Sequence, residues 1–182
     1  MADKKKVAAA AAPSCSNAHG TTRKPSKDTA KRPRYRKPQS IKILEAKAQA
    51  AKEAAHPDFP TAYIPKTNYR DDSSNSLTRS IVDWLRLEGW QAERINSVGS
   101  VRKVKGQMKW LPTNAQKGTA DISATIQGRS VKIEVKCKAT GDRYQSEDQK
   151  AYQQEIEAAG GVYIIAREFT GFMEWYNQFV KS

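Results

Sequence analysis

Three charged residues of the chain, Asp121, Glu134 and Lys136, have side chains of the kinds that cleave phosphodiester bonds. Two carboxylates held about 5 Å apart repel each other, and a divalent cation such as Mg²⁺ or Mn²⁺ binds to oxygens placed in this way. A bound cation lowers the pKa of its water ligand, and a neighbouring lysine can orient that water or a phosphate oxygen. This chemistry requires that the local fold bring the three side chains together.

The three residues lie in two stretches with the alternation of β-strands. Residues 119–126 and residues 131–138 both alternate apolar with polar side chains, which predicts two strands that each bury one face. Gln127-Gly128 separates the two stretches and is typical of the tight turn of a β-hairpin.

The register of this hairpin is restricted to two choices. If Gln127-Gly128 forms the loop, Asp121 lies directly across from Glu134, and if Gly128-Arg129 forms it, Asp121 lies across from Lys136. Both registers place the three charged side chains on one face. A simpler interpretation is that the lysines of the second strand neutralise the glutamate on a solvated sheet face.

A capped helix and a buried strand follow the hairpin. Ser146 is a good N-cap, Gln149 stands where a capping box places Glu or Gln, and Gly160-Gly161 ends the helix. Residues 162–166 are continuously apolar, as in a strand covered on both faces. Together with the second hairpin strand they predict a right-handed βαβ unit. The side chain of Gln149 can cap the helix or face the charged residues.

This succession resembles the PD-(D/E)XK nuclease superfamily, and more narrowly its VRR-NUC branch of virus-type replication-repair nucleases. The pattern is Gly-x-x-Asp, a hairpin to Glu-x-Lys, and a helix that opens with Ser-x-x-Gln and ends in Gly-Gly before an apolar strand. The resemblance runs from about Ser76 to Gln178. The matching positions are Gly118, Asp121, Glu134, Lys136, Ser146 and Gln149.

The resemblance implies a restriction-endonuclease-like α-β-β-β-α-β core with a mixed central sheet. It implies a metal-dependent endonuclease that hydrolyses DNA in phage or prophage replication, repair or recombination. Asp121, Glu134 and the carbonyl of Val135 would bind Mg²⁺ or Mn²⁺. Lys136 would orient or deprotonate the attacking water, and Gln149 would position a water or Lys136. The alternative is a nuclease-fold protein that binds nucleic acid without cutting it.

The chain departs from the family pattern at two places. Ala120 stands where the superfamily has proline before the aspartate. Members of this branch carry an acidic residue near the start of the first helix. That place falls near Ser74-Asn75 here, and Asp72 and Asp83 are the candidate substitutes.

The stretch from Ser97 to Lys117 lacks a regular pattern and is predicted to be a basic loop without acidic residues. It runs directly into the Gly-x-x-Asp motif, so its cations would bring phosphates to the site. Trp110 would stack on a base or wedge into DNA. Alternatively, Trp110 and its apolar neighbours form a hairpin edge packed on the sheet. The residues predicted to bind nucleic acid are Arg102, Lys103, Lys105, Lys109, Trp110, Lys117, Lys138 and Arg143.

Most of the net charge of +13 lies in the first part of the chain. Residues 1–70 hold 16 Lys and Arg against 5 Asp and Glu, whereas residues 71–182 hold 16 against 14. We predict a disordered basic tail and linker over residues 1–70, with a marginal helix over residues 41–55, and the folded domain over residues 71–182. The tail would bind DNA through its phosphates without sequence specificity, or it would only keep the protein soluble.

The remaining elements of the predicted domain follow from apolar spacing. Leu77, Ile81 and Trp84 recur at helical intervals and predict a first helix, and residues 90–95 predict a first strand. A final helix is expected after Thr170. The predicted architecture is one mixed sheet with helices on both faces.

Several classes of site and location are disfavoured by composition. Two cysteines provide no disulfide framework, and the two histidines lie at positions 19 and 56, outside the predicted domain. This pattern excludes a Cys/His zinc site and a Ser-His-Asp triad from that domain. The lack of a disulfide framework fits a cytoplasmic protein. No apolar run has membrane-spanning length, so the expected partner is DNA and not a membrane. A nuclease of this size that cuts both strands needs two active sites, which favours a homodimer.

Overall fold

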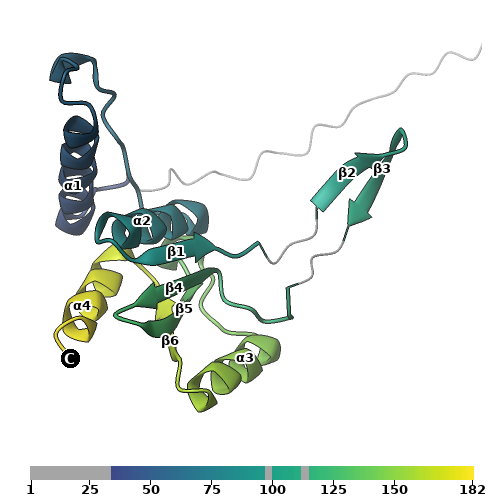
Figure 1. Cartoon of the computed structure of the whole chain (residues 1–182). Helices are drawn as coiled ribbons and strands as arrows, with labels where there is room; N and C mark the ends of the chain where they lie inside the picture. Colours follow the sequence, from purple (N-terminus) through teal and green to yellow (C-terminus); the bar gives the residue numbers. More distant parts are fainter. Residues whose placement is uncertain (1–33, 97–99, 112–114) are drawn as a thin grey trace, which may run out of the picture. The chain divides into compact units, whose positions relative to one another are not determined.

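The computed structural model describes residues 34–96, 100–111 and 115–182. The chain divides into two units, Met1–Arg34 and Tyr35–Ser182, and the second contains all the described helices and strands. A mixed four-stranded sheet forms the centre of the second unit (Figure 1). Its strands, in spatial order, are β1 (Gln91–Arg94), β4 (Ile122–Ile126), β5 (Arg129–Val135) and β6 (Val162–Ala166). Neighbouring strands are antiparallel except β5 and β6, which are parallel.

The hairpin of β4 and β5 has the first of the two predicted registers. Ile122 pairs with Ile133, and Ile126 pairs with Arg129. The two-residue loop is therefore Gln127-Gly128, whose φ angles are 51° and 77°. Two positive φ angles match the twist of the flanking strands, which is why such loops join tight hairpins.

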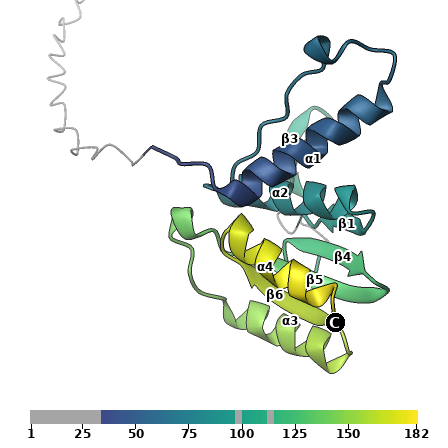
Figure 2. The same cartoon turned by 90° about the vertical axis from the view of Figure 1, so that its left-hand side faces the viewer.

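Helices cover both faces of the sheet (Figures 1 and 2). On one face, α1 (Gln39–Ala55), α2 (Ser74–Leu87) and α4 (Phe169–Phe179) share the main hydrophobic core. On the other face, α3 (Glu147–Ala158) packs beside β6. The strands of this sheet and the helices α2 to α4 follow one another along the chain as α2-β1-β4-β5-α3-β6-α4, which is a mixed α/β arrangement with a final helix. None of the helices in the described ranges is long and apolar enough to span a lipid bilayer.

The folded unit begins near Tyr35, so the predicted boundary at residue 71 is wrong. Ile41 and Leu44 of α1 are completely buried in the core that α2 and α4 also form. The buried residues Ile41, Leu44 and Ala48 lie at i, i+3 and i+7, the spacing of one helical face. Three apolar anchors in a stretch rich in Ala and Lys are a weak sequence signal. The predicted disorder of residues 1–33 lies outside the described residues.

The segment between α1 and α2 was predicted to be an extended linker, but it packs against the folded unit. It contains one short 3₁₀ turn, η1 (Thr61–Tyr63), and it buries Ile64 and Tyr69. The backbone N–H of Tyr69 donates a hydrogen bond of 2.8 Å to Oε1 of Glu45 on α1. These contacts hold the segment along α1.

The stretch predicted to be a basic loop contains a two-stranded ribbon of its own. β2 (Ser100–Val104) and β3 (Gln107–Leu111) pair antiparallel across a Lys105-Gly106 turn and form a sheet separate from the main one. The loop prediction is therefore wrong, and the alternative of a hairpin is right. Val101, Met108 and Trp110 are exposed, however, so the expected packing of Trp110 on the sheet is wrong as well. The alternation that marks a half-buried strand is weak here because none of the side chains of residues 101–110 is buried.

Candidate active site

Asp121 immediately precedes β4 and is fixed by the strands on both sides of it. Its carbonyl oxygen accepts a hydrogen bond of 2.8 Å from the N–H of Ile95, at the end of β1. Its carboxylate oxygen Oδ2 accepts one of 3.0 Å from the N–H of Val135, at the end of β5. The side chain of Asp121 is therefore held toward β5, the strand that carries Glu134.

Glu134 and Lys136 form a buried ion pair at the end of β5. They are 3% and 7% exposed, and Nζ of Lys136 lies 3.4 Å from Oε1 of Glu134. The same Nζ lies 3.2 Å from Oδ2 of Asp142. Burial of a charged group costs free energy unless an opposite charge is next to it. The pairing therefore holds each of these side chains beside its partner. The structure brings the three predicted residues together.

The carboxylate of Glu134 has an unusual electrostatic environment. Burial and, second, the negative charge of Asp121 raise the pKa of Glu134 to about 7, against the opposing effect of Lys136. Oε2 of Glu134 is buried and has no hydrogen-bond partner among the residues that the structure describes. A divalent cation would satisfy this oxygen and would remove the repulsion between the two carboxylates. The donor set therefore fits Mg²⁺ or Mn²⁺.

Gln149 of α3 performs both of the roles between which the sequence left a choice. Its amide oxygen accepts a hydrogen bond of 2.9 Å from the N–H of Ser146, and Oγ of Ser146 accepts one from the N–H of Gln149, which completes a capping box. Its amide nitrogen Nε2 donates a hydrogen bond of 2.5 Å to Oε1 of Glu134. An amide has a donor end and an acceptor end, so one side chain serves the helix and the site together.

Gly118 allows α3 to approach the segment that carries Asp121, just before β4. It has a φ of 77°, and a Cβ at this position would lie 2.2 Å from the carbonyl oxygen of Asp148. Only glycine fits so close to the backbone of the first turn of α3. The contact sets the distance between Gln149 and the site, which gives the Gly-x-x-Asp spacing a structural reason.

The simpler interpretation of the charged face, as a solvated surface, does not describe Glu134. The residue is buried, and of the three lysines that could neutralise it only Lys136 is paired with it in the described contacts. Lys132 instead donates a hydrogen bond of 2.6 Å to Oγ of Ser123. Lys138 lies 4.0 Å from Glu168.

Neither α2 nor the residues just before it contribute a carboxylate to the site through the contacts that the structure describes. Asp72 is paired with Arg70, and Asp83 is paired with Arg79 and accepts a hydrogen bond from the hydroxyl of Tyr69. Asn75 accepts a hydrogen bond of 2.8 Å from Arg94. Within the described ranges no three His, Cys, Asp or Glu side chains form a group that could hold a metal ion. The site therefore offers two carboxylates, and Mg²⁺ in proteins commonly uses one or two with water completing its shell. The carbonyl of Val135 stays a predicted third ligand.

Two residues of the site were missed by sequence reasoning. Asp142 follows Gly141, whose left-handed φ of 77° bends the chain back after β5, whereas the sequence there indicates only a turn. Tyr163 belongs to the continuous apolar run of β6, on the face that packs against α3. Burial and, second, the charge of Glu134 raise the pKa of its hydroxyl. Neither contact has a signal in local sequence, because both depend on segments distant in the chain.

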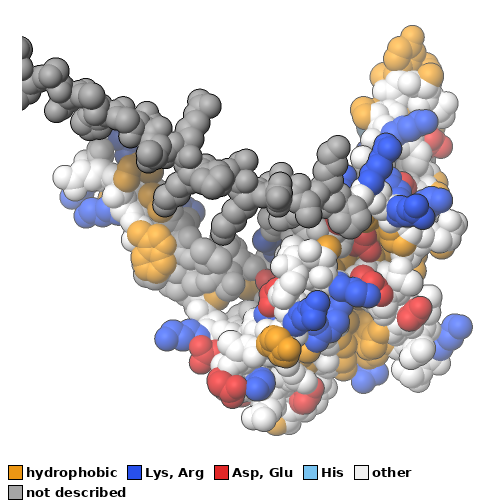
Figure 3. Space-filling model, turned by 180° about the vertical axis from the view of Figure 1, so that it is seen from behind, with side chains coloured by type: hydrophobic (Ala, Val, Ile, Leu, Met, Phe, Trp, Pro, Cys, Tyr) orange, Lys and Arg blue, Asp and Glu red, His pale blue; other side chains and the backbone are white. Residues whose placement is uncertain are grey.

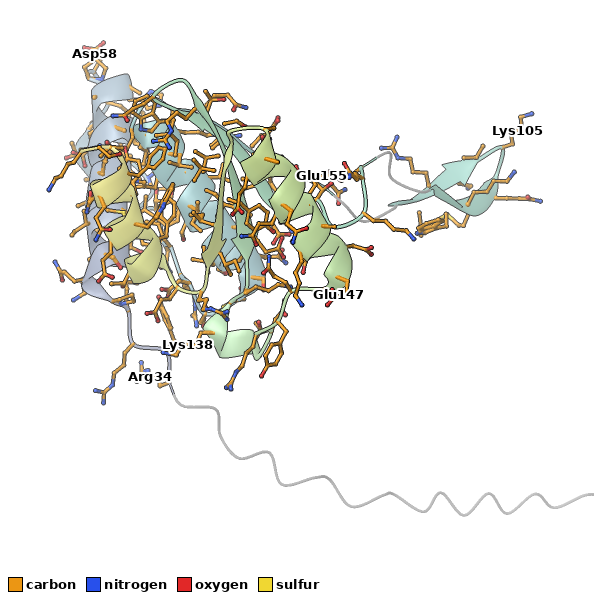
Figure 4. All side chains as sticks on the ribbon, turned by 90° about the horizontal axis from the view of Figure 1, so that it is seen from below. Arg34, Asp58, Lys105, Lys138, Glu147 and Glu155 are labelled. Carbon is orange, nitrogen blue, oxygen red and sulfur yellow. The ribbon has the colours of Figure 1, made fainter. Side chains whose placement is uncertain are left out.

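The residues predicted to bind nucleic acid fall into two groups. Lys117, Lys138 and Arg143 are exposed on segments next to the charged residues in sequence. The others lie on the β2–β3 ribbon, where hydrophobic and basic side chains occur side by side at the left of the view in Figure 3. Figure 4 shows Lys105 at the tip of this ribbon. The members of the ribbon group are Arg102, Lys103, Lys105, Lys109 and Trp110.

Comparison of the chain with protein families, with curated proteins and with solved structures finds no match.

Proposed function

We propose that this chain is a metal-dependent nuclease that hydrolyses phosphodiester bonds of DNA. The observation that carries the proposal is Glu134, a buried carboxylate with one oxygen that no described residue contacts by a hydrogen bond, with an adjacent lysine and a second carboxylate close enough to raise its pKa. An unsatisfied buried acceptor costs about 1–3 kcal/mol, and more when it is charged. A fold that needed no cation would gain stability by replacing Glu134 with a neutral residue.

The side chains divide the work of the proposed reaction. Asp121 and Glu134, with the carbonyl of Val135, would hold Mg²⁺ or Mn²⁺, which would supply an acidified water and stabilise negative charge on the phosphate. Gln149 occupies Oε1 of Glu134 and leaves Oε2 for the cation. Lys136, fixed between Glu134 and Asp142, lies where it can orient the water or a phosphate oxygen.

The surroundings of the site support a nucleic acid as the substrate. The resemblance to PD-(D/E)XK nucleases supports this substrate, and the basic ribbon lies between β1 and β4 in the sequence, shortly before Asp121. We further propose a restriction-endonuclease-like fold, a role in phage or prophage DNA replication, repair or recombination, and a homodimer where both strands are cut.

A cleavage assay tests this proposal. Plasmid, single-stranded, flapped and four-way-junction DNA are incubated with Mg²⁺, Mn²⁺ or EDTA, with wild type beside Glu134→Gln. The matched control is Glu147→Gln, which changes an exposed glutamate at the start of α3. We expect metal-dependent cutting by wild type and by the control, and none by Glu134→Gln. If every DNA is bound and none is cut with either metal, the chain is a binding protein with a nuclease-like fold. The missing carboxylate of α2 would account for that outcome.

A further inference from the structure

The chain segments before and after the β2–β3 ribbon contact the end of the sheet where Asp121 lies. The chain leaves β1 at Ile95, whose N–H is hydrogen-bonded to the carbonyl of Asp121. It returns through Gln116, whose amide donates a hydrogen bond of 2.9 Å to Glu155 of α3, and then enters Asp121. Figure 4 shows Glu155 on the side of α3 where the ribbon begins. A ligand bound to the ribbon would therefore be held near the candidate site.

The two faces of the ribbon differ in chemistry. Val101 pairs with Trp110, and Lys103 pairs with Met108, so these four residues share one face. Val101, Met108 and Trp110 are 58%, 69% and 63% exposed, and this exposure of three large apolar side chains together is unusual for a strand. The face offers an aromatic and aliphatic surface with one cation.

The opposite face brings two cations into direct opposition. Arg102 pairs with Lys109 across the ribbon, and like charges placed directly opposite destabilise a strand pair. Residues 97–117 contain no Asp or Glu that could offset them. A polyanion bound to the ribbon would remove this repulsion. The same excess of positive charge disfavours a second copy of the ribbon as the partner.

The tip of the ribbon also carries a charge that the turn does not require. Lys105 and Gly106 have φ angles of 49° and 82°, and the equivalent residues of the β4–β5 hairpin, Gln127 and Gly128, have 51° and 77°. The two turns have similar φ angles, yet the first residue is neutral in one and cationic in the other. The second hairpin shows that glutamine is accepted at this position, which makes Lys105→Gln a conservative substitution.

We propose that the β2–β3 ribbon binds DNA at an exposed base, with the Val101–Met108–Trp110 face stacked on that base and the basic face on the adjacent phosphates. Bases inside a continuous duplex are covered by their neighbours, so an apolar surface gains a stacking contact only at an end, a gap or a single strand. The proposal rests on the proposed nuclease function for its choice of DNA. It names the kind of DNA that the site would receive.

The test measures binding without cleavage, in the Glu134→Gln background and without divalent cations. Fluorescence anisotropy compares a duplex closed by hairpin loops of abasic linker with the same duplex carrying a central single-stranded gap. We expect tighter binding to the gapped DNA. Trp110→Ala should weaken that binding roughly tenfold and leave the closed duplex unchanged, because stacking is lost only where a base is exposed. Trp110→Phe should retain most of the preference.

The basic residues are tested by their salt dependence. Lys105→Gln and Arg102→Gln should weaken binding to both DNAs alike and should reduce the slope of log affinity against log salt by about 1 each. Lys42→Gln, which removes an exposed cation from α1, is the matched control and should leave the slope unchanged.

Two results would overturn the proposal. One is a Trp110→Ala variant that binds gapped DNA as tightly as the unmodified ribbon. The other is a wild-type dimer, seen by analytical ultracentrifugation, that Trp110→Ala converts to monomer, which would make the apolar face a self-association surface. Because no arm depends on cleavage, ribbon effects without any nuclease activity would refute the proposed function and leave this inference intact.

Discussion

Gln149 and Glu134 are joined by a hydrogen bond of 2.5 Å from the amide nitrogen Nε2 to the carboxylate oxygen Oε1, while the amide oxygen of the same glutamine caps α3. The start of the helix and the orientation of the buried carboxylate are thereby fixed by one side chain. The bond also leaves Oε2 as the unpartnered oxygen among the described contacts. Any movement of the first turn of α3 would therefore change the orientation of the Glu134 carboxylate at the candidate metal site.

Gln149→Glu should separate these two roles. Glutamate is equally suited to the capping box, so the helix should keep its cap. The amide group that donates to Glu134 is replaced by a carboxylate, which repels the carboxylate of Glu134. We expect DNA cleavage to fall at least tenfold with little loss of helicity by circular dichroism. Gln149→Ala removes both roles and should also lower the free energy of unfolding, by about 1 kcal/mol. Unchanged cleavage by Gln149→Glu would show that the bond to Glu134 has no part in activity.

The pKa of Glu134 makes the stability of the metal-free protein depend on pH. The pKa is raised from 4.5 to about 7 on folding, so the unfolded chain releases this proton first as pH rises. Stability contributed by protonated Glu134 is present below pH 4.5 and is lost as pH rises through about 7. At 1.36 kcal/mol per pH unit the loss is about 3 kcal/mol.

Thermal melts in EDTA between pH 4.5 and pH 8 would measure this loss. The melting temperature of wild type should fall over that interval, and that of Glu134→Gln should fall less. Glu147→Gln is the exposed control and should follow wild type. Adding Mg²⁺ or Mn²⁺ at pH 8 should raise the melting temperature of wild type and not that of Glu134→Gln. Equal pH profiles for wild type and Glu134→Gln would contradict the assignment.

Lys136→Met should abolish cleavage while leaving DNA binding close to wild type. The lysine is almost completely buried, so it contributes to the site and not to the basic surface. Its loss leaves Glu134 and Asp142 without their common partner, which should raise the pKa of Glu134 further. The pH profile of metal-stimulated stability would then shift to higher pH. Lys181→Gln, an exposed cation near the C-terminus, should change neither property.

Gly118→Ala and Gly128→Ala form a matched pair that isolates the contact between the strand and α3. Both glycines have a φ of 77°, but a Cβ at Gly118 would lie 2.2 Å from the carbonyl oxygen of Asp148, whereas nothing lies within 4 Å at Gly128. Gly128→Ala should cost only the strain of a left-handed residue, about 1–2 kcal/mol. Gly118→Ala should cost clearly more in urea denaturation, and it should reduce cleavage because α3 and Gln149 are displaced.

Leu44→Ala tests the place of α1 in the folded unit. Leu44 is completely buried, whereas its neighbour Ile43 is 47% exposed. Truncation of a buried leucine costs about 2–5 kcal/mol, so Leu44→Ala should lower the free energy of unfolding by that amount. Ile43→Ala should change it by less than about 1 kcal/mol. Equal, small effects of the two substitutions would instead support the prediction that residues 1–70 form a disordered tail and linker.

The sequence by itself determined the local part of the site. A period of two in residues 119–126 and 131–138, with a turn at Gln127-Gly128, was enough to place Asp121 and Glu134 on one face. The capping signal at Ser146 likewise located the start of α3. These features depend on neighbours within a few residues, so the sequence alone predicts them.

Tertiary structure decided what depends on distant segments. The docking of α1 rests on burial of Ile41 and Leu44 against helices far along the chain, which composition in an alanine-rich stretch does not reveal. The ion pair of Lys136 with Asp142 requires the chain to bend back after β5. Gln149 could take both of its roles only because packing at Gly118 brings α3 close enough for the two ends of one amide to reach different partners.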